Sequence, residues 1–291
     1  MKITNKAGLP QPFVDFATRD YEYKEKRYSV TTLLNPVRQI LLKRRHDSDI
    51  TQDVSEMVWL IFGTAVHKIL EQTKDRDALY KEEKFTHTLE NGYTISGIVD
   101  LYDLENEIVT DYKTASIWKV IFGDYKDWRR QGLAYAWLLK KCGLECKQAK
   151  FYALLKDWNS GDAKRKSEYP KQAVESVVFD VTESGLKEID EFINNKINEL
   201  IKYENIADDE LPLCSEEDRW YTGDKFAVMK NGRKSALRVF DNEEEAKSYM
   251  QENGGDYIEN RKGEDRKCKD YCQCCEFCSY WKEHYKEEES V

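Results

Sequence analysis

The sequence of 291 residues lacks any run of about eighteen apolar residues, the length that a membrane-spanning helix requires. Its first six residues also lack the apolar core of a secretory signal peptide. Neither a membrane anchor nor export is therefore expected. We predict a cytoplasmic protein that has no membrane partner.

The sequence also lacks a surplus of positive charge, since its formal net charge is −9. Such a protein repels phosphates except where lysine, arginine or a bound cation gathers locally. Binding of nucleic acid through overall charge is therefore excluded, and any such site must be local or assisted by a metal. Short basic clusters span residues 43–45, 129–130 and 164–166. We expect the second to lie nearest the active-site cleft, because it immediately precedes Gln131.

Aromatic residues, in contrast, are plentiful. They make up 12% of the sequence, including seven tryptophans, although 35% of all residues are charged. Disordered proteins are poor in aromatic residues, and a chain of this length can bury a sizeable core. The composition therefore predicts a folded chain that is large enough for an enzyme.

The hydrophobic pattern divides the chain into four segments. We predict an N-terminal arm over residues 1–28, an α/β core over 29–204, a small α+β insertion over 205–263 and a cysteine-rich tail over 264–291. Within the insertion, a hairpin around Asn231 and Gly232 precedes a short helix. No motif indicates what this insertion does.

Within the core, helical and strand periodicities alternate. Apolar residues at helical spacing run from Trp59 to Leu70, with His67 on a polar flank. Alternating residues then predict three antiparallel strands between residues 84 and 113. A long helix with Ser184 as N-cap is expected to pack on the outer face of the sheet. Between these lie a helix over residues 127–141 and a strand over 150–155.

Two carboxylates are expected to face each other in this sheet. If the strands on either side of Glu105 and Asn106 form a tight hairpin, counting outward pairs Asp100 with Asp111. Like charges so placed repel each other unless a cation lies between them or one carboxylate takes up a proton. A divalent metal ion would remove this conflict.

The neighbours of Asp111 complete a set of groups suited to hydrolysis of a phosphodiester bond. Side chains alternate along a strand, so Lys113 projects on the same side as Asp111, while Tyr112 offers its backbone carbonyl to the metal. Carboxylates can hold Mg²⁺ or Mn²⁺, the metal makes an attacking water more acidic, and the lysine orients that water or neutralises developing charge.

These residues resemble the motifs of the RecB-like PD-(D/E)XK nucleases. Residues 97–100, Gly-Ile-Val-Asp, are similar to the GxxD motif, and residues 111–113, Asp-Tyr-Lys, to the (D/E)XK motif. Upstream, residues 63–71 resemble the GxxxHxxxE helix, and downstream, residues 131–135 resemble the QxxxY helix. Each motif alone is weak, but the four occur in the family's order. The resemblance covers residues 29–157, about half of the chain.

The resemblance implies a restriction-endonuclease-like α/β fold with a mixed central sheet flanked by helices. It also implies that His67 joins Asp100, Asp111 and the Tyr112 carbonyl as a metal ligand, and that Gln131 and Tyr135 line the catalytic centre with Lys113. Family members act on DNA in phage or bacterial recombination, repair or adaptation. The implied function is thus a DNA exonuclease, with DNA and a recombination or repair protein as partners. Either Glu82 or Glu83 could be a further acidic residue.

The cysteines cluster near the C-terminus. Five of the eight lie within residues 268–278, and in a reducing compartment such crowding favours metal binding over disulfides. Some RecB-like nucleases, including the AddB subunit and CRISPR-adaptation exonucleases, hold a [4Fe-4S] cluster with one cysteine before the nuclease motifs and three after them. Cys268, Cys272 and Cys278 are similar to those three. Cys142 and Cys146 are expected to be inert.

Two questions about this centre stay open. No cysteine precedes the first nuclease motif, so the fourth ligand must be another residue: Cys214 is preferred, and Cys274 or Cys275 is the alternative. Thiolates also suit zinc, and only the resemblance favours iron–sulfur. For the whole chain, the alternative to a nuclease is a module that keeps the fold and binds nucleic acid or protein without catalysis.

Overall fold

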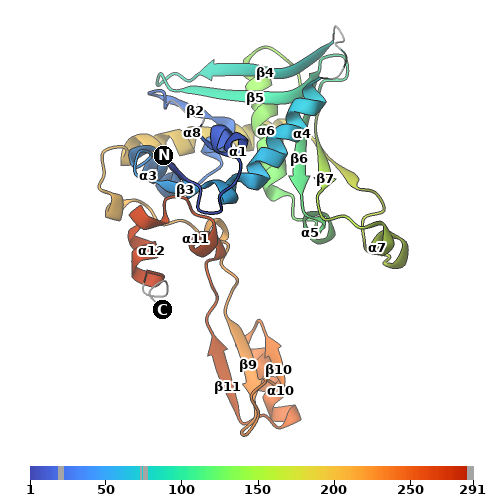
Figure 1. Ribbon diagram of the computed structural model, residues 1–291, viewed down its shortest axis with the longest axis vertical. Helices are drawn as coiled ribbons and strands as arrows, with labels where there is room; N and C mark the ends of the chain where they lie inside the picture. The colour runs from blue at the N-terminus through green and yellow to red at the C-terminus, as the bar shows by residue number, and fades with distance from the viewer. Residues whose placement is uncertain (19–22, 73, 75–77, 287–291) are drawn as a thin grey trace. The chain divides into compact units, whose positions relative to one another are not determined.

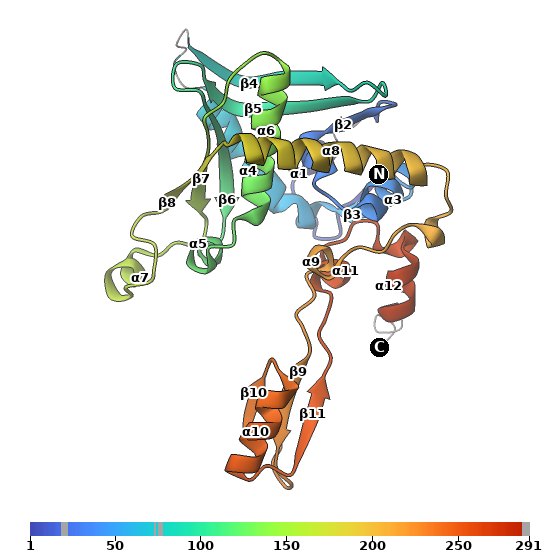
Figure 2. The ribbon, with the colours of Figure 1, turned by 180° about the vertical axis from the view of Figure 1, so that it is seen from behind.

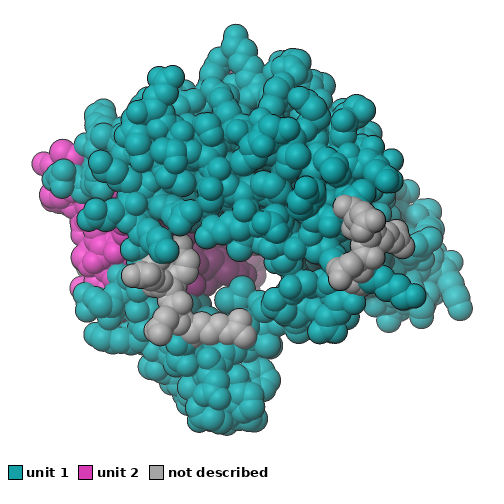
Figure 3. All heavy atoms as spheres, turned by 90° about the horizontal axis from the view of Figure 1, so that it is seen from above, with its two compact units in different colours: residues 1–35, 47–205 teal, residues 36–46, 206–291 magenta. Residues whose placement is uncertain are grey.

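The computed structural model describes residues 1–18, 23–72, 74 and 78–286. The chain divides into two compact units, which Figure 3 shows in separate colours. Unit 1 comprises residues 1–35 and 47–205, and unit 2 comprises residues 36–46 and 206–291. No helix in the described ranges is both long and apolar enough to cross a membrane.

Unit 1 is built on a six-stranded mixed sheet (Figure 1). Five strands follow the order β2-β5-β6-β7-β8, and β4 pairs with β5 as well. The β2–β5 and β6–β7 pairs are parallel, and the others are antiparallel. The predicted mixed sheet is confirmed, although β8 was not predicted. The strands are β2 (Arg27–Ser29), β4 (Leu79–Thr88), β5 (Thr94–Asp103), β6 (Ile108–Ala115), β7 (Gln148–Leu155) and β8 (Val174–Asp180).

Helices flank this sheet on two sides. The α6 helix (Lys126–Lys141) has ten buried residues and contacts the face that carries Asp111, whereas α4 (Val58–Glu71) places His67 at the Tyr112 backbone. Figures 1 and 2 show α4 on the side away from α8. The remaining helices of unit 1 are α1 (Gln11–Ala17), α2 (Val30–Leu33), α5 (Ile117–Phe122), α7 (Ser160–Arg165), α8 (Glu183–Tyr203) and the 3₁₀ turn η1 (Val54–Met57).

The long helix α8 differs from its prediction in two respects. It packs against α6, because α6 already covers that face of the sheet. The contacts include an ion pair between Arg129 and Glu188 at 3.2 Å and a hydrogen bond from Trp137 Nε1 to Asp190 at 2.7 Å. The N-cap is Thr182 rather than Ser184, since the Thr182 side chain accepts a hydrogen bond from the amide of Gly185.

The helix α4 is apolar yet contains no buried residue. Trp59 is 61% exposed and Ile69 is 68% exposed, so the predicted apolar spacing is present but unburied in the described chain. The N-terminal residues are more ordered than an arm. Strand β1 (Lys2–Thr4) pairs in parallel with β3 (Thr51–Asp53). A small core lies beside them, formed by Ala17, Val54 and Met57 with Ile3, Leu9, Phe13 and Val14 packed against it.

The packing of α6 on the sheet depends on Gly132. A Cβ atom there would lie 2.6 Å from the Cβ of Ala149 and 3.1 Å from the Phe151 ring, whereas at Gly63 in α4 the nearest atom would be at 3.6 Å. Alanine favours a helix interior over glycine by about 1 kcal/mol. We therefore expect Gly63→Ala to raise the melting temperature. Gly132→Ala should lower it, since overpacking costs about 1–3 kcal/mol. Thermal denaturation of both variants is the measurement, and equal shifts would contradict the packing.

Unit 2 combines α3 (Val37–Arg45) with the C-terminal part of the chain. A three-stranded antiparallel sheet has the order β10-β9-β11 and is covered by α10, whose Ala246 is fully buried. Its elements are β9 (Lys225–Met229), β10 (Arg238–Phe240), α10 (Glu243–Asn253) and β11 (Tyr257–Arg261). The other elements are η2 (Asp208–Glu210), α9 (Glu216–Arg219), α11 (Arg266–Asp270), η3 (Cys275–Phe277) and α12 (Ser279–His284).

Candidate functional site

The candidate site lies in unit 1, where strand β5 separates from strand β6. Along one edge of β5, residues 94–96 pair with β2 and residues 101–103 pair with β6. In the described chain, residues 97–100 have no ladder partner on this edge. Asp100 lies at the end of this gap, and its Oδ2 accepts a hydrogen bond from the Tyr112 amide at 2.7 Å. A carboxylate therefore takes the place of a backbone partner at the point where the strands separate.

The predicted register of the two acidic strands is confirmed. Asp103 pairs with Ile108, and Leu101 pairs with Thr110, so the next position outward sets Asp100 opposite Asp111. The turn is longer than expected. It spans residues 104–107 and is held by hydrogen bonds from the amide and side chain of Asn106 to the Asp103 carboxylate, at 3.0 and 2.8 Å.

Glu82 is the third acidic residue of the site. Lys81 pairs with Leu101 and Glu83 with Val99, so Glu82 lies opposite Asp100 on the other edge of β5. Its φ of 48° is in the left-handed region that residues with a Cβ atom rarely adopt. Burial and the negative charge of Asp100 raise the pKa of Glu82. Strained backbone of this kind tends to occur at functional sites.

His67 connects the two sides of the gap. Its Nδ1 lies 3.3 Å from Asp100 Oδ1 and 3.8 Å from Glu82 Oε1, and its Nε2 lies 2.8 Å from the Tyr112 carbonyl oxygen. The hydrogen bond with Asp100 raises the pKa of His67. Ligand atoms of His67, Glu82 and Asp100 all lie within 4.8 Å of one another. Three elements, α4, β4 and β5, thus bring potential metal ligands to one point.

Asp111 lies beside this group on β6 and is only 5% exposed. Its Oδ2 is 2.7 Å from Lys113 Nζ, and its Oδ1 accepts a hydrogen bond from Gln131 Nε2 at 2.9 Å. Gln131 also lies 3.3 Å from the Tyr135 hydroxyl. Burial raises the pKa of Asp111 to about 6, while the ammonium of Lys113 opposes this rise and the charge of Asp100 adds to it.

The donor set fits a hard divalent cation. Such ions prefer carboxylate and carbonyl oxygen, with imidazole as a further ligand for Mn²⁺. The site offers three carboxylates, Glu82, Asp100 and Asp111. Burial is the largest cause of the raised pKa values of Glu82 and Asp111, and the charge of Asp100 adds to both. The Tyr112 carbonyl oxygen contacts His67 Nε2, whereas Asp100 and Glu82 lie at Nδ1, the other ring nitrogen.

The strained backbone at Glu82 allows a test of stability against function. Glycine adopts a φ of 48° without steric penalty, so Glu82→Gly should raise the free energy of unfolding by about 1 kcal/mol while weakening Mn²⁺ binding. Glu83→Gly is the matched control, because Glu83 is exposed and its backbone is not in the left-handed region. That variant should lose stability and keep metal affinity. Calorimetry measures the free energy of unfolding and the Mn²⁺ affinity of each variant. A destabilised Glu82→Gly protein would refute the backbone strain, and an unchanged Mn²⁺ affinity would refute the metal-binding role of Glu82.

The basic pair at residues 129–130 contacts the helix α8. The Arg129 side chain pairs with Glu188, and the Arg130 guanidinium lies over the Phe192 ring at 5.2 Å, so both contact α8. The prediction that this pair lies nearest the cleft among the three basic clusters stays a prediction. In unit 2, Arg45 pairs with Asp208 at 2.6 Å.

Six cysteines of unit 2 line one pocket. The pocket is formed by Cys214, Cys268, Cys272, Cys274, Cys275 and Cys278, together with side chains of α3 and Trp281. Burial and the neighbouring thiols Cys278 and Cys272 raise the pKa of Cys214 to about 11. Burial and the thiols Cys272, Cys214 and Cys278 raise the pKa of Cys268 to about 12. The four predicted ligands thus interact with one another. Cys142 and Cys146 lie in unit 1.

The spacing of the sulfur atoms distinguishes two kinds of centre. Tetrahedral zinc with Zn–S bonds of about 2.3 Å holds its sulfurs about 3.8 Å apart. Cys272 and Cys274 meet this spacing at 3.6 Å. However, no three sulfurs of the described cysteines lie within 4.8 Å of one another. The tetrahedral spacing is thus met by the Cys272–Cys274 pair but by no group of three described thiols.

Sequence reasoning left Glu82 undecided and missed Arg38. Glu82 and Asp100 each lie nine residues from Asn91, the centre of the β4–β5 turn, and counting outward from that turn would have selected Glu82. Arg38, 3% exposed, enters the cysteine pocket from α3, where its Nη1 lies 3.4 Å from Cys278 Sγ and its Nε donates to the Pro212 carbonyl at 3.1 Å. No local pattern signals a contact across so many residues.

The sequence matches no protein-family model and none of the curated proteins. Several solved structures are similar to part of this chain at low sequence identity. SSO0001 is 15% identical over 67% of this chain and 84% of its own, with a TM-score of 0.47. An alkaline exonuclease from Laribacter hongkongensis is 10% identical over 62% and 90%, with a TM-score of 0.38. A phage-related exonuclease from Haemophilus somnus is 17% identical over 65% and 78%, with a TM-score of 0.29. All three TM-scores are below 0.5.

Proposed function

We propose that this chain is a Mg²⁺- or Mn²⁺-dependent deoxyribonuclease of the PD-(D/E)XK class, and specifically an exonuclease. The observation that carries the proposal is the convergence of His67, Glu82 and Asp100 ligand atoms within 4.8 Å, beside the Asp111–Lys113 ion pair. The substrate is DNA, and the setting is recombination, repair or adaptation in the cytoplasm of a bacterium or in phage infection. A recombination or repair protein is the proposed partner.

Each side chain has a distinct role in this proposal. Asp100, Asp111, Glu82, His67 and the Tyr112 carbonyl would hold the ion. When bound, the ion would make an attacking water more acidic and offset the negative charge that develops on the phosphate. Lys113 would orient that water and stabilise developing charge from its place 2.7 Å from Asp111. Gln131 and Tyr135 act as positioning residues, because Gln131 bonds to both Asp111 and the Tyr135 hydroxyl.

For the second centre we propose a [4Fe-4S] cluster held by Cys214, Cys268, Cys272 and Cys278. Its role is structural: it ties the tail to residue 214 and so closes the loop that contains the inserted unit. We also propose that the segments predicted from the sequence end at residues 28, 204 and 263. Zinc remains the competing assignment, and the resemblance to nucleases that hold such a cluster is what supports iron–sulfur.

The activity is tested with two DNA substrates that differ only in that one has free ends and the other has none. Linear duplex and covalently closed circular DNA of one sequence are incubated with the protein and Mg²⁺ or Mn²⁺, and each product is followed over time. An exonuclease releases nucleotides from the linear DNA and leaves the circle intact. Cleavage of the circle would show an endonuclease. Binding without cleavage of either DNA would support the alternative of a non-catalytic binding module.

A further inference from the structure

The insertion between Cys214 and Cys268 carries basic side chains that the active site does not use. Strands β9 and β10 and the turn between them, residues 225–240, are called the basic hairpin here. This segment contains five basic residues and no acidic one, in a chain with a net charge of −9. The five are Lys225, Lys230, Arg233, Lys234 and Arg238.

Two of the five have partners within the insertion. Lys225 forms an ion pair with Asp241, and the Arg238 guanidinium lies 5.1 Å from the centre of the Phe240 ring and 5.6 Å from that of Tyr249. Lys230, Arg233 and Lys234 are exposed at the turn and form no ion pair with any residue in the described ranges. These three charges therefore have no structural role that the fold reveals.

Four acidic residues of the insertion, in contrast, have structural roles. Glu243, Glu244 and Glu245 occupy the first turn of α10, where negative charge stabilises the helix dipole. Asp256 accepts a hydrogen bond from the Asn231 amide at 2.6 Å and so holds the turn. The acids maintain the fold, and the bases at the turn face solvent.

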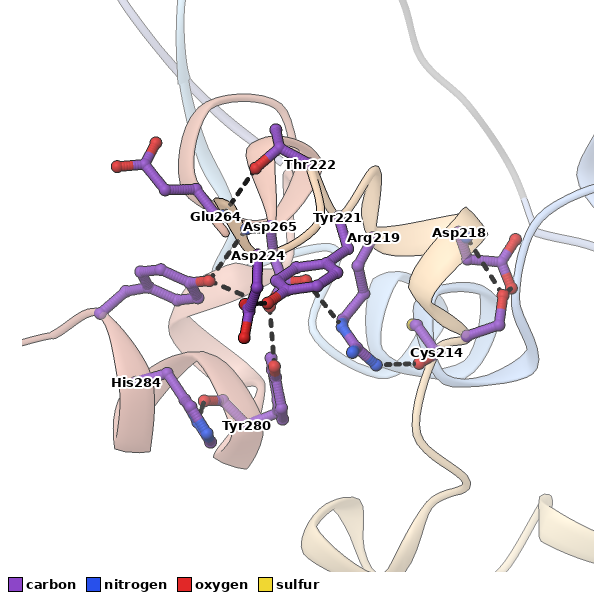
Figure 4. A network of polar contacts seen from close by, with 12 residues as sticks. Cys214, Asp218, Arg219, Tyr221, Thr222, Asp224, Glu264, Asp265, Tyr280 and His284 are labelled. Atoms are coloured by element: carbon purple, nitrogen blue, oxygen red, sulfur yellow. Dashed lines mark hydrogen bonds and ion pairs between the residues drawn. The ribbon is translucent and has the colours of Figure 1, made fainter. Parts of the chain in front are cut away.

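A polar network fixes the base of the insertion (Figure 4). Asp265 is 2% exposed and accepts hydrogen bonds from Arg219 at 3.0 Å and from the hydroxyls of Tyr280 and Tyr285 at 2.7 and 2.9 Å. Arg219 also donates to the Cys214 carbonyl, and Cys268 follows Asp265 by three residues. Both connections of the insertion therefore end at residues that line the cysteine pocket.

We propose that the basic hairpin binds the phosphate backbone of DNA through Lys230, Arg233 and Lys234, as a contact separate from the active site. The turn, residues 230–235, is Lys-Asn-Gly-Arg-Lys-Ser and contains no apolar side chain that could insert into a membrane. Lysine and arginine side chains are among the groups that bind DNA phosphates. The hairpin supplies the local positive charge that a chain of this net charge requires.

The test compares two triple variants by fluorescence anisotropy with labelled duplex DNA, without added divalent cation and between about 50 and 200 mM salt. One carries Lys230→Gln, Arg233→Gln and Lys234→Gln. The control carries Lys147→Gln, Lys187→Gln and Lys247→Gln, which removes the same charge at lysines paired with Glu107, Glu191 and Glu243. For the hairpin variant, the slope of log affinity against log salt should fall by about 2.7, about 0.9 for each phosphate contact. Its affinity should fall at least about tenfold near 0.1 M salt.

The control variant should keep the slope of the unmodified protein, and both variants should keep its melting temperature. Equal slopes for both variants, or no change in either, would overturn the proposal. Tighter binding of the unmodified protein to anionic lipid vesicles or to a polyglutamate peptide than to DNA would also overturn it. The same variants in an Asp111→Ala background should give the same slopes. Failure of the unmodified protein to cleave DNA would therefore refute the proposed nuclease without refuting this DNA contact.

Discussion

Replacing Asp111 with alanine is expected to lower the rate of DNA hydrolysis by about 10³-fold or more, since removing a ligand of a catalytic metal costs several kcal/mol of transition-state stabilisation. Asp111 is 5% exposed and bonded to both Lys113 and Gln131, so its loss would remove both contacts from the site. Lys113→Ala should cost about 10²–10³-fold, the usual effect of losing one group that stabilises developing charge. Rates on linear DNA under single-turnover conditions measure both.

The control for these variants is Asp180→Ala. Asp180 is an exposed residue at the end of β8 in the same sheet, and its carboxylate accepts a hydrogen bond from Gln148. This variant should keep the activity of the unmodified protein. Thermal denaturation of all three variants separates loss of chemistry from loss of fold. If Asp111→Ala and Lys113→Ala hydrolyse DNA as fast as the unmodified protein, the proposed mechanism is wrong.

Removing one cluster ligand should have the largest effect on stability. Metal binding to structural thiolate sites contributes about 10–16 kcal/mol in small zinc domains, and unit 2 otherwise has only a small three-stranded sheet and short helices. Cys272→Ala should therefore abolish visible absorption and iron content. It should also make residues 206–286 sensitive to proteolysis. Hydrolysis of short oligonucleotides by unit 1 should persist, because His67, Asp100, Asp111 and Lys113 all lie outside unit 2.

Two matched cysteine variants sharpen this result. Cys142→Ala changes an exposed thiol of unit 1 and should alter neither absorption nor proteolysis. Cys275→Ala changes a thiol that lines the pocket but is not among the four proposed ligands, and it should retain the cluster. A colourless protein that contains one zinc ion per chain would show a single-ion zinc site instead of the proposed cluster. Loss of iron from Cys275→Ala would revise the ligand set.

Local patterns predicted much of the geometry of the candidate site. The register of β5 and β6 followed from counting outward from the turn, and it places Asp100 opposite Asp111 even though the turn is longer than expected. Lys113 reached Asp111 because alternate residues of a strand share a face. The contact of Gln131 with Asp111 agrees with the helix motif that suggested it. These features depend on short-range geometry, which a sequence expresses directly.

Other features depend on tertiary packing and could not be predicted. The stacking of α8 on α6 takes up Arg129 and Arg130, and nothing in their own segment indicates that Glu188 and Phe192 will meet them. The left-handed backbone at Glu82 lies within β4 at a residue that is neither glycine nor asparagine, so the residue type does not indicate it. Arg38 reaches carbonyl groups more than 170 residues away, because α3 belongs to the same compact unit as the cysteine tail.

The central claim is that a divalent ion binds where α4, β4, β5 and β6 meet. Anomalous diffraction from a crystal soaked in Mn²⁺ tests it most directly. The expected result is a manganese peak bounded by His67, Glu82, Asp100 and Asp111, which disappears in a crystal of the Glu82→Gln, Asp111→Ala double variant. A peak elsewhere with none among these four side chains, at a Mn²⁺ concentration that supports any hydrolysis, would contradict the account.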